Sequence, residues 1–184
     1  YDTVTFSGTA TFAPTSTFNY AGSGVIPQIV SNLPYGGLGI FGSSTKTFPA
    51  SVTVKGNFTA GATADFTTNN TNFIYDAGSP LLPTQLVAAT TYNDLTLTGA
   101  RAGTTIRLGN GVSNNIIKIK GVFTVTATGY NQVNDQFNTV DFISSGPQTI
   151  PGFWYGFITN SGSGPRTWDN LGSTNTAHVI SCKS

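Results

Sequence analysis

The sequence contains no glutamate and no methionine, and charged residues make up only 8% of its 184 positions. Both absent residue types are strong helix formers, whereas the abundant threonine, valine, isoleucine, phenylalanine and tyrosine favour strands. Typical globular domains contain about 25% charged residues. The composition therefore predicts a nearly all-β protein, and the length fits one domain or a short array.

Further absences argue against several classes of protein. The net charge is only +1 and no basic stripe is present, which argues against nucleic-acid binding. The lone Cys182 allows no disulfide within the chain. No apolar run approaches the ~20 residues of a membrane span, and no secretion signal is present, so we expect a mature form or an excised segment. The sparse charge is typical of an extracellular or surface-displayed protein and permits association between copies.

The most informative feature that is present is an eight-residue phrase that occurs three times. Its middle copy, residues 92–99, reads Tyr-Asn-Asp-Leu-Thr-Leu-Thr-Gly, and the others are residues 35–42 and 155–162. The three tyrosines are 57 and 63 residues apart. In the middle copy we expect Leu95 and Leu97 to point inward, Thr96 and Thr98 to point outward, and Gly99 to turn. A repeat of this length predicts an array or a solenoid.

A second phrase precedes each tyrosine phrase and contains a short strand, a Gly-Ser turn, apolar residues and a proline. Its copies are residues 18–27, 73–83 and 140–151. Aligned on their last prolines, the copies are 56 and 68 residues apart. Two phrases that recur in the same order make a chance match improbable, which strengthens the prediction of a repeat array.

Other segments alternate strictly between apolar and polar residues, which is typical of half-buried strands. Residues 1–20 also alternate, which indicates an edge strand whose free edge can pair with a strand of another chain. Residues 104–120 fit either a long hairpin or a corner between two coils. Two further apolar faces consist of Val52, Val54, Gly56, Phe58 and Ala60, and of Ile117, Ile119, Gly121, Phe123, Val125 and Ala127.

The order of these phrases resembles the repeats of large secreted surface proteins of Bacteroidetes. Those repeats follow the patterns Q-x-I-P, Y-x-N-L-x-I-x-G and V-x-V-x-G-N-L-T, and the matching segments here are residues 147–151, 92–99 and 52–59. The resemblance implies an extracellular adhesive or structural module, built as a parallel β-solenoid, and brings no catalytic residues with it. The last copy departs from the pattern at Phe157 and Ile158, which we interpret as a terminal, interface or capping repeat.

We therefore predict a single all-β repeat domain over residues 1–184, with approximate repeats 1–60, 61–127 and 128–184. The predicted architecture is a parallel β-solenoid. The alternative is an antiparallel β-sandwich whose copies assemble by donating a strand.

No motif indicates an enzyme, a cofactor or a metal site. The seven acidic residues are all aspartates, and they are scattered rather than paired as a glycosidase requires. Asp76 and Asp94 are expected to stabilise turns, and the sole histidine, His178, is expected to lie in a strand without a catalytic partner.

Candidate contact residues are Trp154, Tyr155 and Trp168. We interpret them as core or subunit-interface aromatics, with a sugar-stacking surface as the alternative. Candidate glycosylation sites are Thr3, Asn57 and Asn69.

The predicted function is that of a structural extracellular protein, as a filament subunit or a segment of a repeat adhesin that self-associates through strand edges. The expected partners are further copies of the chain and surface glycans. A carbohydrate-binding module of a secreted protein is the alternative, and a polysaccharide-active enzyme is a third hypothesis.

Overall fold

The computed structural model describes residues 10, 12–13, 15–61, 63–77, 82–109, 115–132, 138–169 and 176–182, with the backbone alone at residues 132 and 176–182. All regular elements within these residues are β-strands. They are β1 (Thr17–Tyr20), β2 (Gln28–Ile29), β3 (Pro34–Tyr35), β4 (Gly37–Ile40), β5 (Lys46–Thr47), β6 (Ser51–Val54), β7 (Phe58–Thr59), β8 (Ala64–Asp65), β9 (Asn72–Asp76), β10 (Thr84–Val87), β11 (Thr91–Tyr92), β12 (Asp94–Thr98), β13 (Thr105–Leu108), β14 (Asn115–Ile119), β15 (Phe123–Val125), β16 (Asn131–Gln132), β17 (Asn138–Phe142), β18 (Gln148–Ile150), β19 (Trp154–Asn160), β20 (Arg166–Trp168) and β21 (Thr176–Cys182).

Three strands make one turn over most of the chain. Strand β4 returns beside β1, β5 beside β2 and β6 beside β3, and all three pairs are parallel. Two sheets contain five strands each, in the orders β3-β6-β9-β12-β15 and β11-β14-β17-β19-β21. The predicted parallel β-solenoid is therefore confirmed, and the antiparallel sandwich is not the fold of this chain.

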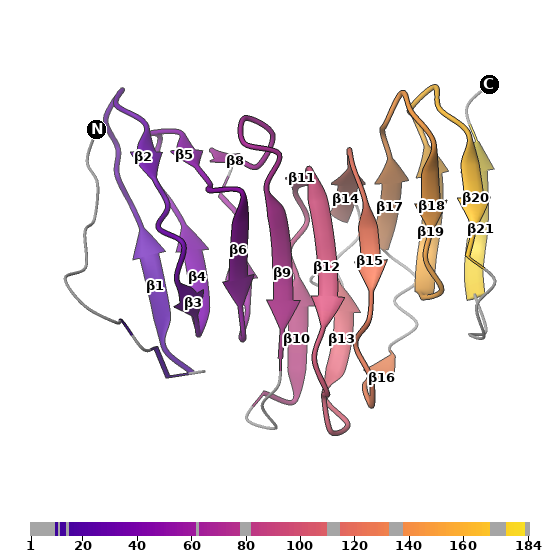
Figure 1. The fold of residues 1–184 in the computed structure, drawn as a ribbon, viewed down its shortest axis with the longest axis horizontal. Coiled ribbons are helices and arrows are strands. Elements are labelled where there is room, and N and C mark those ends of the chain that lie inside the picture. The colour runs from indigo at the N-terminus through magenta and orange to yellow at the C-terminus, as the bar shows by residue number, and fades with distance from the viewer. Residues whose placement is uncertain are drawn as a thin grey trace.

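The strands are stacked along the long axis of the molecule, with β1 near one end and β21 at the other (Figure 1). Strands β6, β9, β12 and β15 form the layer nearest the viewer, and β10, β13, β14 and β17 lie behind them (Figure 1). The interior between these layers is filled by side chains from alternate positions of each strand, as the period-2 geometry of a strand requires.

Strand β12 shows how the alternation is used. Leu95 and Leu97 are fully buried, whereas Thr96 and Thr98 are half-exposed on the outer face. Gly99 ends the strand with φ at +92°, a conformation that favours glycine. The predicted inward leucines, outward threonines and turning glycine are confirmed.

The other predicted apolar faces also point inward. Val52, Val54 and Phe58 are buried in the first half of the solenoid, and Ile117 and Ile119 are buried in the second half. Aromatic rings dominate the core between them. The Phe48 and Phe66 rings are stacked with centroids 4.3 Å apart, and the Phe58 and Phe73 centroids are 4.6 Å apart.

The sequence repeat is eight strands long. The tyrosine phrase begins at β3, β11 and β19, the strand before the Gly-Ser turn is β1, β9 and β17, and the valine-rich strand β6 recurs as β14. Eight is not a multiple of the three strands in a turn. The first copy of the tyrosine phrase therefore begins at β3, in a different sheet from the second and third copies, which begin at β11 and β19 of one sheet and are separated there by β14 and β17.

The first two tyrosine phrases bend at a corner, and the third does not. The chain bends at Gly36 between β3 and β4, and at Asn93 between β11 and β12. The third phrase continues through Gly156 as the single strand β19, although its register with β21 skips Gly156. Because a corner is missing there, the last turns contain fewer strands.

The third phrase keeps more of the pattern than the sequence indicated. Ile158 is buried three residues after Tyr155, in the position of Leu38 and Leu95, and Phe157 lies outward. The departure comes instead at Asn160, which follows two residues later where the other copies have an inward apolar residue. The interpretation of Ile158 as a departure was therefore wrong.

The ambiguous segment over residues 104–120 forms no hairpin. Strand β13 pairs with β10 and β16, and strand β14 pairs with β11 and β17. The two strands belong to different sheets, so the reading as a corner between coils is the correct one.

Candidate functional site

A sheet of the solenoid stops at β7, and a new sheet begins beside it at β10. Side chains join the two strands across this break. Nε2 of Gln85 donates a hydrogen bond to the oxygen of Gly56 at 2.8 Å and to that of Lys55 at 3.2 Å. The Leu86 amide donates to Oδ1 of Asn57 at 2.9 Å. Gln85 is fully buried, so its amide replaces part of a backbone ladder inside the protein.

The same device recurs eight strands later, at the break between β15 and β18. Nε2 of Gln148 donates to the oxygen of Gly121 at 2.5 Å and to that of Ile119 at 3.1 Å. Gly121 and Gly56 follow equivalent strands of the repeat. The two breaks are therefore a repeated feature of the fold.

A third glutamine, Gln28, occupies the equivalent position in the first turn. Gln28, Gln85 and Gln148 each stand seven residues before the tyrosine of their phrase. This equivalence corrects the alignment of the second phrase, because Pro147, directly before Gln148, corresponds to Pro27, directly before Gln28. The alignment of Pro151 with Pro27 was wrong.

A cation follows each tyrosine phrase, in the series Lys46, Arg101 and Arg166; Lys46 and Arg101 are fully buried, and Arg166 is half-buried. Nζ of Lys46 donates to the oxygen of Gly22 at 2.9 Å and to that of Ser44 at 2.6 Å. Lys46 is fully buried, and this burial lowers the pKa of its ammonium group. The lysine thereby holds the β4–β5 connection against the β1–β2 connection of the preceding turn.

Arg101 and Arg166 do the same with a guanidinium group. Nη2 of Arg101 donates to the oxygen of Tyr75 at 2.8 Å, and Nη1 donates to Oε1 of Gln85. Nη2 of Arg166 donates to the oxygens of Phe142 and Ser144, both at 2.9 Å. Burial lowers the pKa of Arg101 to about 10, and the nearby negative charge of Asp76 opposes this shift. These three cations tie turns together and have no catalytic geometry.

The first tyrosine of each phrase makes the same kind of hydrogen bond. Each hydroxyl donates to the backbone oxygen of the residue four positions earlier, and burial raises the pKa of each hydroxyl. The bonds run from Tyr35 to Ser31 at 2.8 Å, from Tyr92 to Ala88 at 2.9 Å, and from Tyr155 to Pro151 at 2.8 Å.

In the first two copies a second tyrosine extends this network. The hydroxyls of Tyr75 and Tyr92 are 2.9 Å apart, and the Ala88 amide donates to the Tyr75 hydroxyl at 3.0 Å. Tyr20, Tyr35 and Ser31 repeat this geometry at 2.9 and 3.0 Å.

The third copy lacks both members of the amide-to-hydroxyl bond. Phe142 replaces the second tyrosine and has no hydroxyl, and Pro151 stands where Ala88 and Ser31 donate and has no amide hydrogen. The hydroxyl that would accept this bond and the amide hydrogen that would be donated are thus both absent from the third copy. Neither replacement leaves a polar partner of this bond unpaired.

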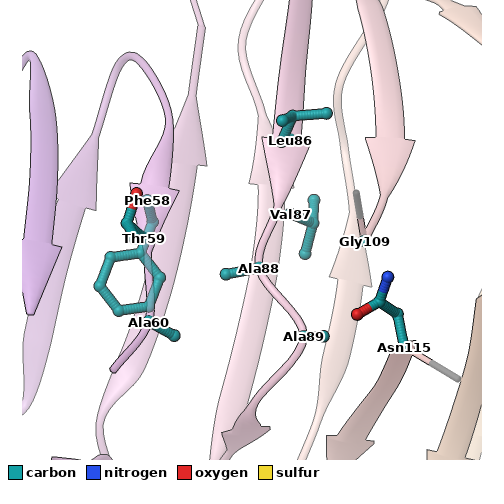
Figure 2. Close-up of a pocket in the computed structure, with 9 residues that line it drawn as sticks. All are labelled: Phe58, Thr59, Ala60, Leu86, Val87, Ala88, Ala89, Gly109 and Asn115. Atoms are coloured by element: carbon teal, nitrogen blue, oxygen red, sulfur yellow. The ribbon is translucent and has the colours of Figure 1, made fainter. Parts of the chain in front are cut away.

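Each sheet break opens outward as a groove. The first groove has a volume of about 330 Å³ and is lined by Phe58, Thr59, Ala60, Leu86, Val87, Ala88, Ala89, Gly109 and Asn115. Residues 58–60 come from the β7 side and residues 86–89 from the β10 side (Figure 2). The lining is apolar or neutral throughout.

The second groove lies at the other break and is more polar. Its volume is about 490 Å³, and it is lined by Phe123, Thr124, Val125, Thr126, Ala127, Tyr130, Thr149, Pro151, Gly152 and Asp169. It therefore combines two aromatic rings, a carboxylate, three threonine hydroxyls and the hydroxyl of Tyr130. The two grooves are the recessed surfaces that we take as candidate sites.

The predicted aromatic residues lie close together in sequence but not on one surface. Tyr155 is buried, and the Trp168 ring packs edge-on against it with centroids 6.5 Å apart. Trp154 precedes Tyr155 in β19 and is half-buried outside the core cluster, to which Trp168 contributes. Trp168 and Tyr155 thus act as core aromatics here, and sugar stacking by this set of residues stays a prediction.

Asp94 is the first residue of β12, and its carboxylate bonds to the next coil rather than within its own turn. Its Oδ1 accepts the Val122 amide at 2.6 Å and so stabilises the neighbouring corner. Asp76 ends β9 near Arg101. The described part of the chain holds no group of three or more histidine, cysteine or acidic side chains that fits a metal ion.

The predicted glycosylation asparagines both make structural hydrogen bonds. Asn57 accepts the Leu86 amide, and Nδ2 of Asn69 donates to the oxygen of Phe48 at 2.7 Å. Thr3 and the alternating segment over residues 1–9 lie outside the described residues, as do the side chains of His178 and Cys182.

Sequence reasoning missed the glutamines and the cations, although a signal for both was present. The glutamines keep a constant spacing of seven residues to each phrase tyrosine, and the cations follow the tyrosines by 11, 9 and 11 residues. In a chain with only eight lysines and arginines, that recurrence is informative.

No model of a protein family matches this chain, and comparisons with curated proteins and with solved structures gave no significant match. Among the described residues no helix is long and apolar enough to cross a membrane.

Proposed function

We propose that this chain is a structural, non-enzymatic extracellular protein that self-associates through its strand edges, as a filament subunit or as a segment of a repeat adhesin. The observation that carries the proposal is a group of exposed apolar side chains on the first turn of the solenoid. Low net charge, sparse charged residues and the resemblance to secreted repeat proteins support the extracellular setting.

The first turn exposes more large apolar side chains than any other turn within the described residues. Val25 is 99% exposed, and Ile26 and Ile29 in the same turn are also exposed. Phe41, after β4 in the next turn, is exposed as well. The other exposed large hydrophobic residues within the described part, Ile116 and Val122, lie farther along the solenoid. A concentration of apolar surface at one place is typical of an interaction site, whereas single exposed residues are ordinary.

The backbone of the first turn adds a second reason for association at this place. Strand β2 pairs on one side with β5 and is the first strand of its sheet, as β1 and β3 are of theirs. In a parallel ladder the outer edge of such a strand presents unpaired N–H and C=O groups that another strand can bind. Contacts between unlike ends of a molecule extend into filaments when they do not close.

Paired charge substitutions test this proposal. We expect Ile26→Lys combined with Ile29→Lys to abolish assembly, because the interface between unlike ends would then bury lysine charges of one copy without a partner on the next. The matched control is Ile116→Lys combined with Val122→Lys, which adds the same charge to other exposed apolar positions. Sedimentation velocity and negative-stain microscopy at high protein concentration measure the outcome.

Assembly by the unchanged chain and by the control, but not by the first-turn variant, supports the proposal. Dispersed monomers of the unchanged chain at high concentration, with and without calcium, overturn it. Equal assembly by both variants would show that the first turn is not part of the interface.

A further inference from the structure

The two grooves share one frame but differ in their chemistry. In the first groove the Gly109 amide donates to the oxygen of Val87 at 2.7 Å. In the second, the Asp169 amide donates to the oxygen of Ile150 at 2.9 Å. Val87 and Ile150 both stand two residues after the bridging glutamine, so Asp169 occupies the position of Gly109. At this position of the shared frame, the second groove therefore has a carboxylate side chain where the first has only the hydrogen atom of a glycine.

Other polar groups surround this carboxylate. Thr124, Thr126 and Thr149 line the same groove, and Thr126 and Thr149 are exposed. A carboxylate has two oxygens with about four acceptor sites, and each threonine hydroxyl both donates and accepts. The wall thus offers hydrogen bonds of both kinds to a ligand rich in hydroxyl groups.

An aromatic ring completes the lining. Tyr130 is half-buried, and its ring lies nearly parallel to that of Phe153, with centroids 5.8 Å apart and an interplanar angle of 21°. The packing on Phe153 holds the Tyr130 ring in place before any ligand arrives. A fixed aromatic ring beside hydroxyl-binding groups suits the apolar face of a sugar ring.

The charge of the groove restricts the ligand further. Among the described residues that line the groove, Asp169 is the one charged residue, and none is a lysine or an arginine. Phosphates, nucleic acids and acidic polysaccharides require cations at their binding sites, so they fit this groove poorly. The volume of about 490 Å³ lies in the range of small-ligand sites.

We infer that the second groove binds an uncharged glycan chain, with Asp169 and the three threonines contacting sugar hydroxyls and Tyr130 contacting a sugar ring. This inference is independent of self-association and uses a different surface. The first groove has the same frame without the carboxylate and the tyrosine, and serves as an internal comparison.

Calorimetric titration of the full chain with uncharged hexasaccharides tests the inference. The probes are β-1,4-linked hexamers of glucose, xylose, mannose and N-acetylglucosamine, with a hexagalacturonate as the acidic comparison. We expect at least one uncharged probe to bind at millimolar concentration or below. Asp169→Gly, which reproduces the first groove, should weaken that binding about 10-fold or more, because a hydrogen bond to a charged group is lost.

Three further variants make the result specific. Tyr130→Ala should also weaken binding, whereas Thr59→Ala, in the first groove, should leave it unchanged. Asp169→Asn keeps the volume and the backbone bond, and it provides the readout if Asp169→Gly fails to fold by circular dichroism. The assembly variant Ile26→Lys/Ile29→Lys should bind the glycan normally, so loss of assembly and loss of binding are separable.

Binding of no uncharged probe at 10 mM overturns the inference. So does binding that Asp169→Asn and Tyr130→Ala leave intact, equal loss on Thr59→Ala, or tighter binding of the hexagalacturonate.

Discussion

Nε2 of Gln85 donates a hydrogen bond to the backbone oxygen of Gly56 at 2.8 Å, across the break between β7 and β10. The same side chain accepts a bond from Arg101. One buried amide therefore joins two sheets and orients a buried cation.

Replacing this glutamine should destabilise the solenoid. Gln85→Met keeps the length of the side chain but leaves the oxygens of Lys55 and Gly56 without their donor. We expect a loss of about 3 kcal/mol in the free energy of unfolding, since each unsatisfied buried polar group costs about 1–3 kcal/mol. Urea unfolding followed by circular dichroism measures the change. Gln28→Met is the matched control and should cost less than about 1 kcal/mol, because Gln28 is half-buried and its Oε1 accepts the Gly22 amide at 3.1 Å, near the surface.

The missing hydroxyl and the missing amide hydrogen in the third copy should be energetically coupled. Pro151→Ala introduces a buried N–H group that faces Phe142, and it should destabilise the protein by about 1–2 kcal/mol. Adding Phe142→Tyr supplies the acceptor that Tyr75 provides for Ala88. The double variant should therefore be more stable than the sum of the single changes by about 1 kcal/mol. A double-mutant cycle that shows no coupling would contradict the equivalence of the three copies.

Arg101 should contribute more to stability than an arginine on the outer face. Arg101→Met leaves the oxygens of Tyr75 and Thr98 without a donor inside the protein. We expect a loss of about 3 kcal/mol, measured by urea unfolding. The control is Arg107→Met in β13, where the side chain is half-exposed and the cost should be below about 1 kcal/mol.

Asp65 should make part of the stability depend on pH. Burial alone would raise the pKa of this carboxyl. Hydrogen bonds from the hydroxyls and amides of Thr67 and Thr68 lower the pKa by more than burial raises it, so the pKa in the folded protein lies below its ordinary value. A lowered pKa in the folded state contributes stability above the unfolded pKa of about 4, and this contribution is lost as the pH falls through the folded pKa.

The pH dependence can be measured by urea unfolding at pH 7, 4 and 2.5. The stability difference between the unchanged chain and Asp65→Asn should shrink as the pH falls. A difference that is constant over this range would rule out the role of the Asp65 hydrogen bonds.

Much of the fold was predictable because the burial pattern of a strand depends on residues that are adjacent in the sequence. The alternation in residues 52–60 and 117–127 identifies buried faces, and Leu95 and Leu97 point inward as expected. The repeats in turn predicted a solenoid. These features depend on neighbouring residues, so the sequence displays them directly.

The path of the chain around the solenoid could not be predicted in the same way. A corner is a single bent residue, Gly36 or Asn93, within a phrase that otherwise reads as one strand. The sequence therefore did not show the number of strands in a turn, nor the sheet to which each copy of a phrase belongs. The grooves depend on this geometry because Tyr130 and Asp169 meet only when β15 and β18 are placed side by side.

The mismatch between eight strands in a repeat and three in a turn limits how the molecule presents its surfaces. The break at β7 and β10 and the break at β15 and β18 belong to different sheets, so their openings face different directions. A single rigid, flat surface cannot reach both at once. A partner that occupies both grooves must wrap around the solenoid, or two separate partner molecules must bind. The chain therefore presents its binding surfaces on more than one side.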